Sequence, residues 1–156
     1  MHPVKTISVS GHRPHHLPAR ADHYIRSAIH ETADLYPGAT WLTGGATGSD
    51  QMATDVLLQR GERVELVLPF APEVQGARWS VDQQAKLRDH LGRVQAVHVL
   101  RDTYHPDGYR DRNRELVRRA DLLVAFWNMR PGGSGTAMTV RMAERARIAV
   151  IVVPMY

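Results

Sequence analysis

The chain has 156 residues, of which 43% are hydrophobic and 23% charged, and its formal net charge at pH 7 is +4. This composition is typical of one globular domain, and the absence of cysteine excludes disulfide bonds and thiol chemistry. No apolar run approaches the ~20 residues that span a membrane, and the N-terminus lacks an apolar signal segment. We therefore expect a single domain over residues 1–156, located in the cytoplasm and without a membrane partner.

Apolar stretches rich in β-branched residues alternate along the chain with segments of helical periodicity. Strands are predicted at residues 4–10, 39–43, 64–68, 94–100, 122–127 and 149–153. Helices are predicted at residues 19–36, 50–61, 80–91, 109–120 and 136–145, and residues 69–79 are interpreted as a loop that could form part of a lid. This alternation predicts an α/β, Rossmann-like, doubly wound and mainly parallel sheet with helices on both faces. Within it we expect Val124, Phe126, Ile151 and Val153 to be buried.

Two glycine-rich turns each follow a predicted strand and precede a predicted helix, at residues 44–49 and 132–136. Glycine lets the backbone approach a ligand closely, and the N–H groups at a helix start favour an anion. Ligands in open parallel sheets bind beyond the carboxyl ends of the strands, so the two loops predict one shared phosphate site. Neither loop has the P-loop or the dinucleotide-binding pattern. Tight turns without a ligand are the alternative interpretation.

Polar residues next to these loops suit an anionic ligand. Arg13 follows the first strand, and its guanidinium is a suitable fork for phosphate or carboxylate. Arg112 and Asn113 lie in the first turns of a helix, where an arginine opposes the helix dipole unless an anion is present. A solvated face with salt bridges is the alternative. Asp50 suits either capping of its helix or contact with a ribose hydroxyl.

Adjacent histidines at positions 15 and 16 raise the question of a metal site. No nearby carboxylate or further histidine completes a ligand set, so we expect no metal and no cofactor.

These motifs resemble the SLOG superfamily of Rossmann-like nucleotide-binding domains over nearly the whole chain. Residues 10–13 are similar to the end of the first strand in the YpsA-like and DprA (Smf) groups, and residues 44–50 resemble their Gly-x-Ala-x-Gly-x-Asp loop. Residues 112–114 are similar to the Arg-Asn-Arg segment of DprA. Residues 131–136 resemble the Pro-Gly-Gly-x-Gly-Thr motif of Lonely Guy phosphoribohydrolases. Within this superfamily, the chain as a whole most resembles the stand-alone YspA/YpsA-like proteins.

The motifs and the resemblance together predict a ligand site and imply homo-oligomers. The predicted ligand-binding residues are Gly11, Arg13, Gly44, Gly45, Ala46, Gly48, Ser49, Asp50, Arg112, Asn113, Gly132, Gly133, Ser134, Gly135 and Thr136. The chain departs from Lonely Guy enzymes just after the Gly-Thr pair, where those enzymes carry acidic residues. Met138 and Thr139 stand there instead, so the usual catalytic glutamate is missing.

Three functions are compatible with these residues. The first is binding of a nucleotide or nucleotide-derived ligand through the two glycine-rich phosphate loops, and we favour it. The second is an N-glycosidase acting on nucleoside monophosphates, which needs a carboxylate such as Asp50, Asp102 or Asp107. The third is single-stranded DNA binding as in DprA, which the arginines support but the interleaved acids and the lack of a run of aromatics weaken. Whether the protein is an enzyme is left open.

Overall fold

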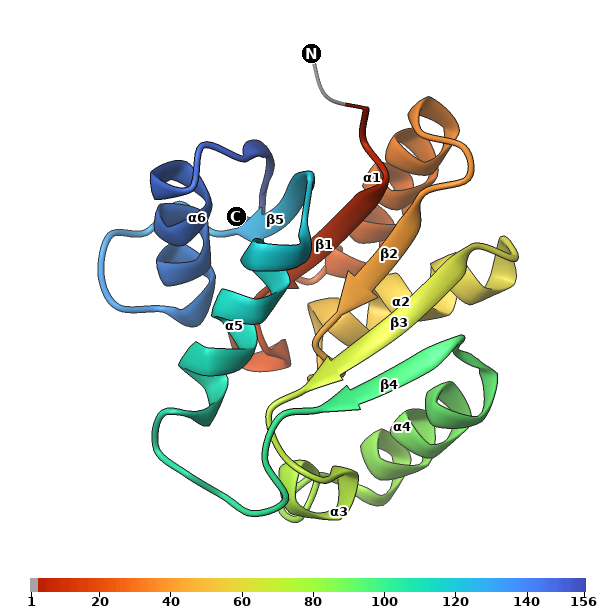
Figure 1. The fold of residues 1–156 in the computed structure, drawn as a ribbon, viewed down its shortest axis with the longest axis vertical. Coiled ribbons are helices and arrows are strands. Elements are labelled where there is room, and N and C mark those ends of the chain that lie inside the picture. The colour runs from red at the N-terminus through yellow and green to blue at the C-terminus, as the bar shows by residue number, and fades with distance from the viewer. Residues whose placement is uncertain (1–2) are drawn as a thin grey trace.

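The computed structural model describes residues 3–156 as one sheet with helices on both faces (Figure 1). All six strands are parallel, in the order β4-β3-β2-β1-β5-β6. The strands are β1 (Thr6–Gly11), β2 (Thr40–Thr43), β3 (Arg63–Leu68), β4 (Ala96–Val99), β5 (Leu122–Trp127) and β6 (Ala149–Pro154). The helices are α1 (Ala21–Leu35), α2 (Ser49–Gln59), α3 (Pro72–Gln75), α4 (Val81–Arg93), α5 (Gly108–Arg119) and α6 (Gly135–Arg145), with a 3-10 turn at η1 (Pro14–His16). The predicted fold class is confirmed.

The strand order places a crevice beside β1. The chain runs outward from β1 to β4 and then crosses to the other side of β1 to form β5 and β6. At such a reversal the connections leave the sheet in opposite directions, which opens a space at the carboxyl ends of the strands. In this chain that position lies between β1 and β5.

Two apolar layers hold the helices against the sheet. On one face Ile7 and Val9 of β1 pack with Ile25 and Ile29 of α1, and Trp41 is fully buried with them. On the other face the core cluster contains Leu123 and Ala125 of β5, Val117 of α5, and Val140 and Ala143 of α6. Figure 1 shows α5 and α6 in front of the sheet and α1 and α2 behind it. Among the described residues no helix is both long enough and apolar enough to cross a membrane.

Two expectations about local structure are corrected. Val124 and Phe126 are fully buried, but Ile151 and Val153 are only half-buried, because β6 is an edge strand that pairs with β5 alone. The expected loop at residues 69–79 contains the short helix α3, and Phe70 and Gln75 are buried. This segment is therefore packed against the domain and does not form a free lid.

Candidate functional site

A cleft of about 310 Å³ opens at the carboxyl end of β1, the strand beside which the strand order reverses. Four parts of the chain line it: the end of β1 with η1, the start of α2, one face of α5 and the start of α6. Ala46 comes from the first glycine-rich segment and Asp50 directly follows it, and Ser134, Gly135 and Thr136 come from the second. The two segments therefore meet at one edge of the sheet.

The cleft brings together most of the residues that the sequence predicts for ligand binding. Those lining it are Gly11, Arg13, Ala46, Asp50, Arg112, Asn113, Ser134, Gly135 and Thr136. The remaining predicted residues lie outside the lining, some buried behind it and some exposed beyond it. The buried ones are Gly44, Gly45, Gly48 and Ser49, and the exposed ones are Gly132 and Gly133.

The first glycine-rich loop already holds an anionic group of the protein itself. All of residues 41–50 are buried, and the Asp50 Oδ2 atom accepts the N–H of Ala46 at 3.2 Å. The N–H and the hydroxyl of Ser49 both donate to the carbonyl oxygen of His12, at 3.1 and 3.0 Å. The Asp50 carboxyl thus occupies a position where the sequence suggested a ligand phosphate.

Gly44 lets two buried charged side chains approach the loop from opposite elements. A Cβ atom on this residue would overlap Arg112 Nη1 and would lie 2.8 Å from Asp50 Oδ2. Arg112 Nη1 instead donates to the Gly44 carbonyl oxygen at 2.6 Å, and Arg112 Nε donates to Asn113 Oδ1 at 2.9 Å. Arg112 is therefore a fixed side chain of the cleft wall and not a solvated helix residue.

Burial shifts the pKa values of both charged groups. It raises the pKa of Asp50 above its ordinary value, although Arg112 and Arg13 nearby and the backbone N–H of Ala46 act in the opposite direction. Burial likewise lowers the pKa of Arg112, and the Asp50 carboxyl partly offsets that effect. Residues 3–156 provide no direct ion pair to either group. The two charges therefore lie in a cleft that has removed most of their water.

Arg13 is the arginine of the cleft that remains available to an anion. Its guanidinium carbon lies 5.3 Å from the centre of the Tyr109 ring, and that of Arg112 lies 5.9 Å from the same ring. Tyr109 in turn contacts Phe70 edge to face, with ring centres 5.4 Å apart. Within the described part of the chain no carboxylate forms an ion pair with Arg13. The aromatic ring positions this guanidinium without neutralising it.

Seven lining residues were not assigned to the site from the sequence, and four of them carry rings with polar atoms: His12, His15, His16 and Tyr109. The other three are Val9, Ser10 and Leu116. The Nε2 atom of His12 accepts the N–H of Asn128 at 3.0 Å, which joins the end of β1 to the end of β5. The rings of His15 and His16 lie 4.0 Å apart. Across residues 3–156 no cluster of three side chains suits a metal ion. The signal that could have identified the three histidines is their position next to Arg13 at the end of a central strand, whereas Tyr109 lies at the start of α5.

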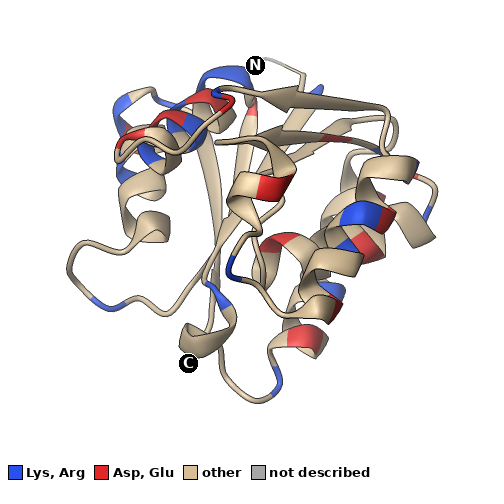
Figure 2. Cartoon of the chain, turned by 90° about the horizontal axis from the view of Figure 1, so that it is seen from below, with Lys and Arg blue, Asp and Glu red and all other residues tan. Residues whose placement is uncertain are grey.

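The three carboxylates considered for catalysis are separated by the fold. Asp50 lines the cleft. Asp102 is exposed in the loop after β4, and Asp107 forms an ion pair of 2.9 Å with Arg110. Charges elsewhere are mixed, since Figure 2 shows basic and acidic residues interleaved on the same helices. A cleft with a local excess of positive charge therefore lies in a surface without one dominant sign.

The hydrogen bond to His12 predicts a pH dependence of stability. Burial, and then the neighbouring His16 and His15, lower the pKa of His12 below its ordinary 6.5. The unfolded state therefore binds more protons, and the free energy of unfolding should fall as the pH drops below about 6.5. His12→Gln keeps a hydrogen-bond acceptor but cannot become charged. Urea unfolding at pH 7.5 and at pH 5.5 should show a smaller drop in the free energy of unfolding for this variant than for the wild type. Equal drops would show that His12 does not cause the pH dependence.

Comparisons with known proteins place the fold. No family model and no curated protein sequence matches the chain. DprA of Streptococcus pneumoniae matches with a TM-score of 0.73 at 20% identity, over 97% of this chain and 50% of that one. DprA of Helicobacter pylori matches with a TM-score of 0.70 at 17% identity, over 97% and 66% of the two chains. The molybdenum cofactor carrier protein of Chlamydomonas reinhardtii matches with a TM-score of 0.62 at 22% identity, over 94% of this chain and 74% of that one.

The chain thus spans between half and two thirds of the length of these DprA proteins. At 17% to 22% identity the similarity is one of backbone architecture. The chain therefore has a Rossmann-like α/β fold that it shares with DprA and with molybdenum cofactor carrier proteins.

Proposed function

We propose that the cleft binds a nucleotide or nucleotide-derived ligand, with its phosphate held between Arg13 and the start of α6. The observation that carries this proposal is that an arginine without an ion-pair partner and a helix N-terminus line the same cleft. Ser134 caps α6 by accepting the N–H of Ala137 at 3.1 Å. The N–H groups of Gly135 and Thr136, at the first two helical positions, have no partner within the helix. They and the helix dipole favour an anion at this end of the cleft.

The proteins that share the fold support ligand binding on this fold in general. One DprA structure concerns single-stranded DNA binding, and other neighbours carry the molybdenum cofactor. We favour a small ligand over DNA because basic and acidic residues are interleaved on the same helices of the domain (Figure 2). We also propose, on the motifs, that the chain belongs to the SLOG superfamily. The homo-oligomer expected from that resemblance stays a prediction.

Binding is a better proposal than N-glycosidase activity. Thr139, at a position where the resemblance places an acid, is fully buried and donates to the Gly135 carbonyl oxygen at 2.8 Å. Among the residues lining the cleft, Asp50 is the single carboxylate. A carboxylate in the place typical of the phosphoribohydrolases is therefore lacking, and the arrangement supports holding a ligand.

Arg13→Ala tests the proposal by removing the guanidinium that remains available to a phosphate. A hydrogen bond to a charged group contributes about 1.5–3 kcal/mol, so the affinity should fall about ten- to a hundredfold. Calorimetric titration with AMP, GMP, CMP, UMP and inorganic phosphate measures the change. The matched control is Arg141→Ala, which removes the same charge from an exposed position on α6 outside the cleft.

We expect the Arg141 variant to bind like the wild type. Equal affinity of the wild type and the Arg13 variant would place the site elsewhere. Equal losses of affinity in both variants would show that only the net charge of the protein matters. If the wild type bound none of these probes, the proposed function would be wrong.

A further inference from the structure

Asp50 is an acidic side chain facing a space that otherwise favours anions. Its residue is 5% exposed, and it lines the cleft together with Arg13, Arg112 and the start of α6. One carboxyl oxygen accepts the N–H of Ala46, and no arginine, lysine or histidine of residues 3–156 forms an ion pair with the group. Buried carboxylates normally have hydrogen-bond partners for their lone pairs. The charges of Arg112 and Arg13 and the backbone of Gly44 also act on this carboxyl. Because Asp50 lines the cleft, it can accept a further hydrogen bond from a group bound there.

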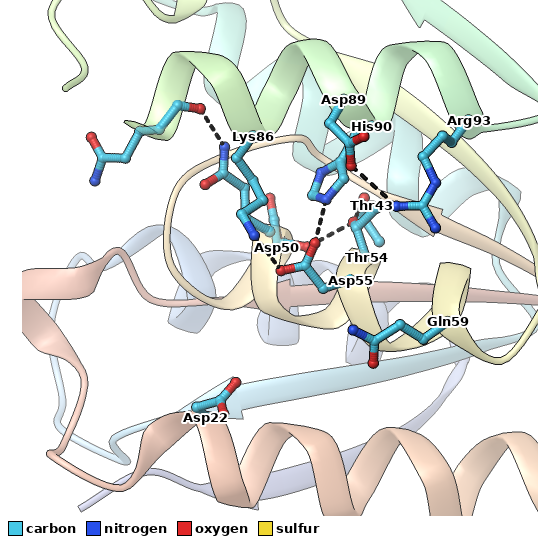
Figure 3. Close-up of polar contacts among 12 residues, drawn as sticks. Asp22, Thr43, Asp50, Thr54, Asp55, Gln59, Lys86, Asp89, His90 and Arg93 are labelled. Atoms are coloured by element: carbon cyan, nitrogen blue, oxygen red, sulfur yellow. Dashed lines mark hydrogen bonds and ion pairs between the residues drawn. The ribbon is translucent and has the colours of Figure 1, made fainter. Parts of the chain in front are cut away.

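Asp50 is also held firmly by its helix. Its carbonyl oxygen accepts the hydroxyl of Thr54 at 2.7 Å, and Thr54 contacts the hydroxyl of Thr43 on β2 at 2.9 Å. One turn further along α2, Asp55 contacts Lys86 at 2.9 Å and His90 at 2.7 Å, which ties α2 to α4 (Figure 3). The start of α2 thus has anchors to the sheet and to a second helix. A ligand must adapt to the Asp50 carboxyl, since the helix that carries it is fixed.

A carboxylate and a phosphate site in one small cleft restrict the ligand. A second phosphate beside Asp50 would be repelled, whereas a hydroxyl group can donate to it. The volume of about 310 Å³ is at the small end of ligand sites. The donor must therefore lie within a short distance of the phosphate on the same molecule. A sugar phosphate has this arrangement, with an anion at one end of the ring and hydroxyl groups at the other.

Resting on the proposed function, we infer that Asp50 is a specificity-determining residue which accepts a hydrogen bond from a sugar hydroxyl of the ligand. The cleft then selects the phosphomonoester of a ribose unit over its deoxyribose counterpart. A hydrogen bond from this hydroxyl to Asp50 would be charge-assisted when the carboxyl is ionised. Its loss should weaken binding about ten- to a hundredfold. The same selection would disfavour DNA as the ligand of this cleft.

The test compares ligands that differ in one hydroxyl group. Isothermal titration of the wild-type chain with AMP and 2′-deoxy-AMP should show a ten- to hundredfold loss of affinity for 2′-deoxy-AMP. 3′-Deoxy-AMP, which keeps the 2′-hydroxyl, should bind more tightly than 2′-deoxy-AMP. Ribose 5-phosphate against 2-deoxyribose 5-phosphate repeats the comparison without a base. In Asp50→Asn the ratio of the deoxy analogue's dissociation constant to that of AMP should shrink about fivefold or more. A neutral hydrogen bond is weaker than a charged one, so less affinity depends on the hydroxyl.

Asp82→Asn is the matched control, since Asp82 is also an acid in the first turn of a helix but lies outside the cleft. It should keep the wild-type ratio, and thermal melts establish that each variant is folded. Equal binding of AMP and 2′-deoxy-AMP by the wild type would overturn the inference while leaving the phosphate site intact. Tighter binding of a deoxyoligonucleotide than of its RNA counterpart would also overturn it. Failure of all probes to bind would overturn the proposed function as well.

Discussion

Gly48→Ala should destabilise the protein by about 2–6 kcal/mol, which is a large fraction of the stability of a domain. Gly48 has φ 82° and ψ −125°, a conformation that strains an L-residue by about 1–3 kcal/mol. A Cβ atom here would lie 2.6 Å from the carbonyl oxygen of His12 and 3.0 Å from the backbone of Arg13. Overpacking of this kind adds about 1–3 kcal/mol, because backbone atoms cannot move aside as a flexible side chain can.

Gly61→Ala separates the two contributions. Gly61 has a similar φ of 76°, but an added Cβ would meet nothing within 4 Å. Its substitution should therefore cost only the backbone strain, about 1–2 kcal/mol. Urea unfolding of both variants measures the difference. Equal destabilisation would show that the contact between the first glycine loop and the end of β1 can relax freely.

The sequence predicts the fold well because its local patterns agree with each other. The continuous apolar run of β5 indicated a strand covered on both faces, and residues from Leu122 to Phe126 are indeed buried. The burial of β6 was overestimated for a physical reason. An equally apolar strand is only half-buried when it lies at an edge, and the order of strands is not encoded in the local pattern.

The site was predictable in its position and less so in its polar contacts. Strand–loop–helix order was sufficient to bring both glycine segments to one edge, because parallel strands end on the same side. Asp50 accepts a hydrogen bond from the Ala46 N–H. This bond depends on the orientation of the Asp50 side chain, which the spacing of residues in the sequence does not determine. The bond from Asn128 to His12 joins residues 116 positions apart. Such contacts follow from tertiary packing, so sequence patterns indicated the cleft but not how its walls are held.

Asp50→Asn should stabilise the unliganded protein at pH 7. Burial raises the pKa of Asp50 above its ordinary 3.8, so the native state binds the proton more tightly than the unfolded state does. The favourable contribution of this tighter binding is present at low pH and is lost as the pH rises through the native pKa. At neutral pH a buried carboxylate therefore opposes folding. Asparagine has nearly the same shape, still accepts the N–H of Ala46 and carries no charge.

The sign of the expected gain at pH 7 follows from the raised pKa of Asp50, because the variant has no buried carboxylate to ionise. The gain should diminish as the pH falls towards 3.8, where the wild-type carboxyl becomes protonated in both states. Urea midpoints at pH 7 and pH 4.5 measure this trend, and a variant less stable than the wild type at pH 7 would contradict it. Adding AMP should narrow the difference, because the wild type binds AMP more tightly and gains the larger ligand contribution to stability. A carboxylate that lowers stability in the free protein and raises affinity in the complex is what a ligand-selecting group requires.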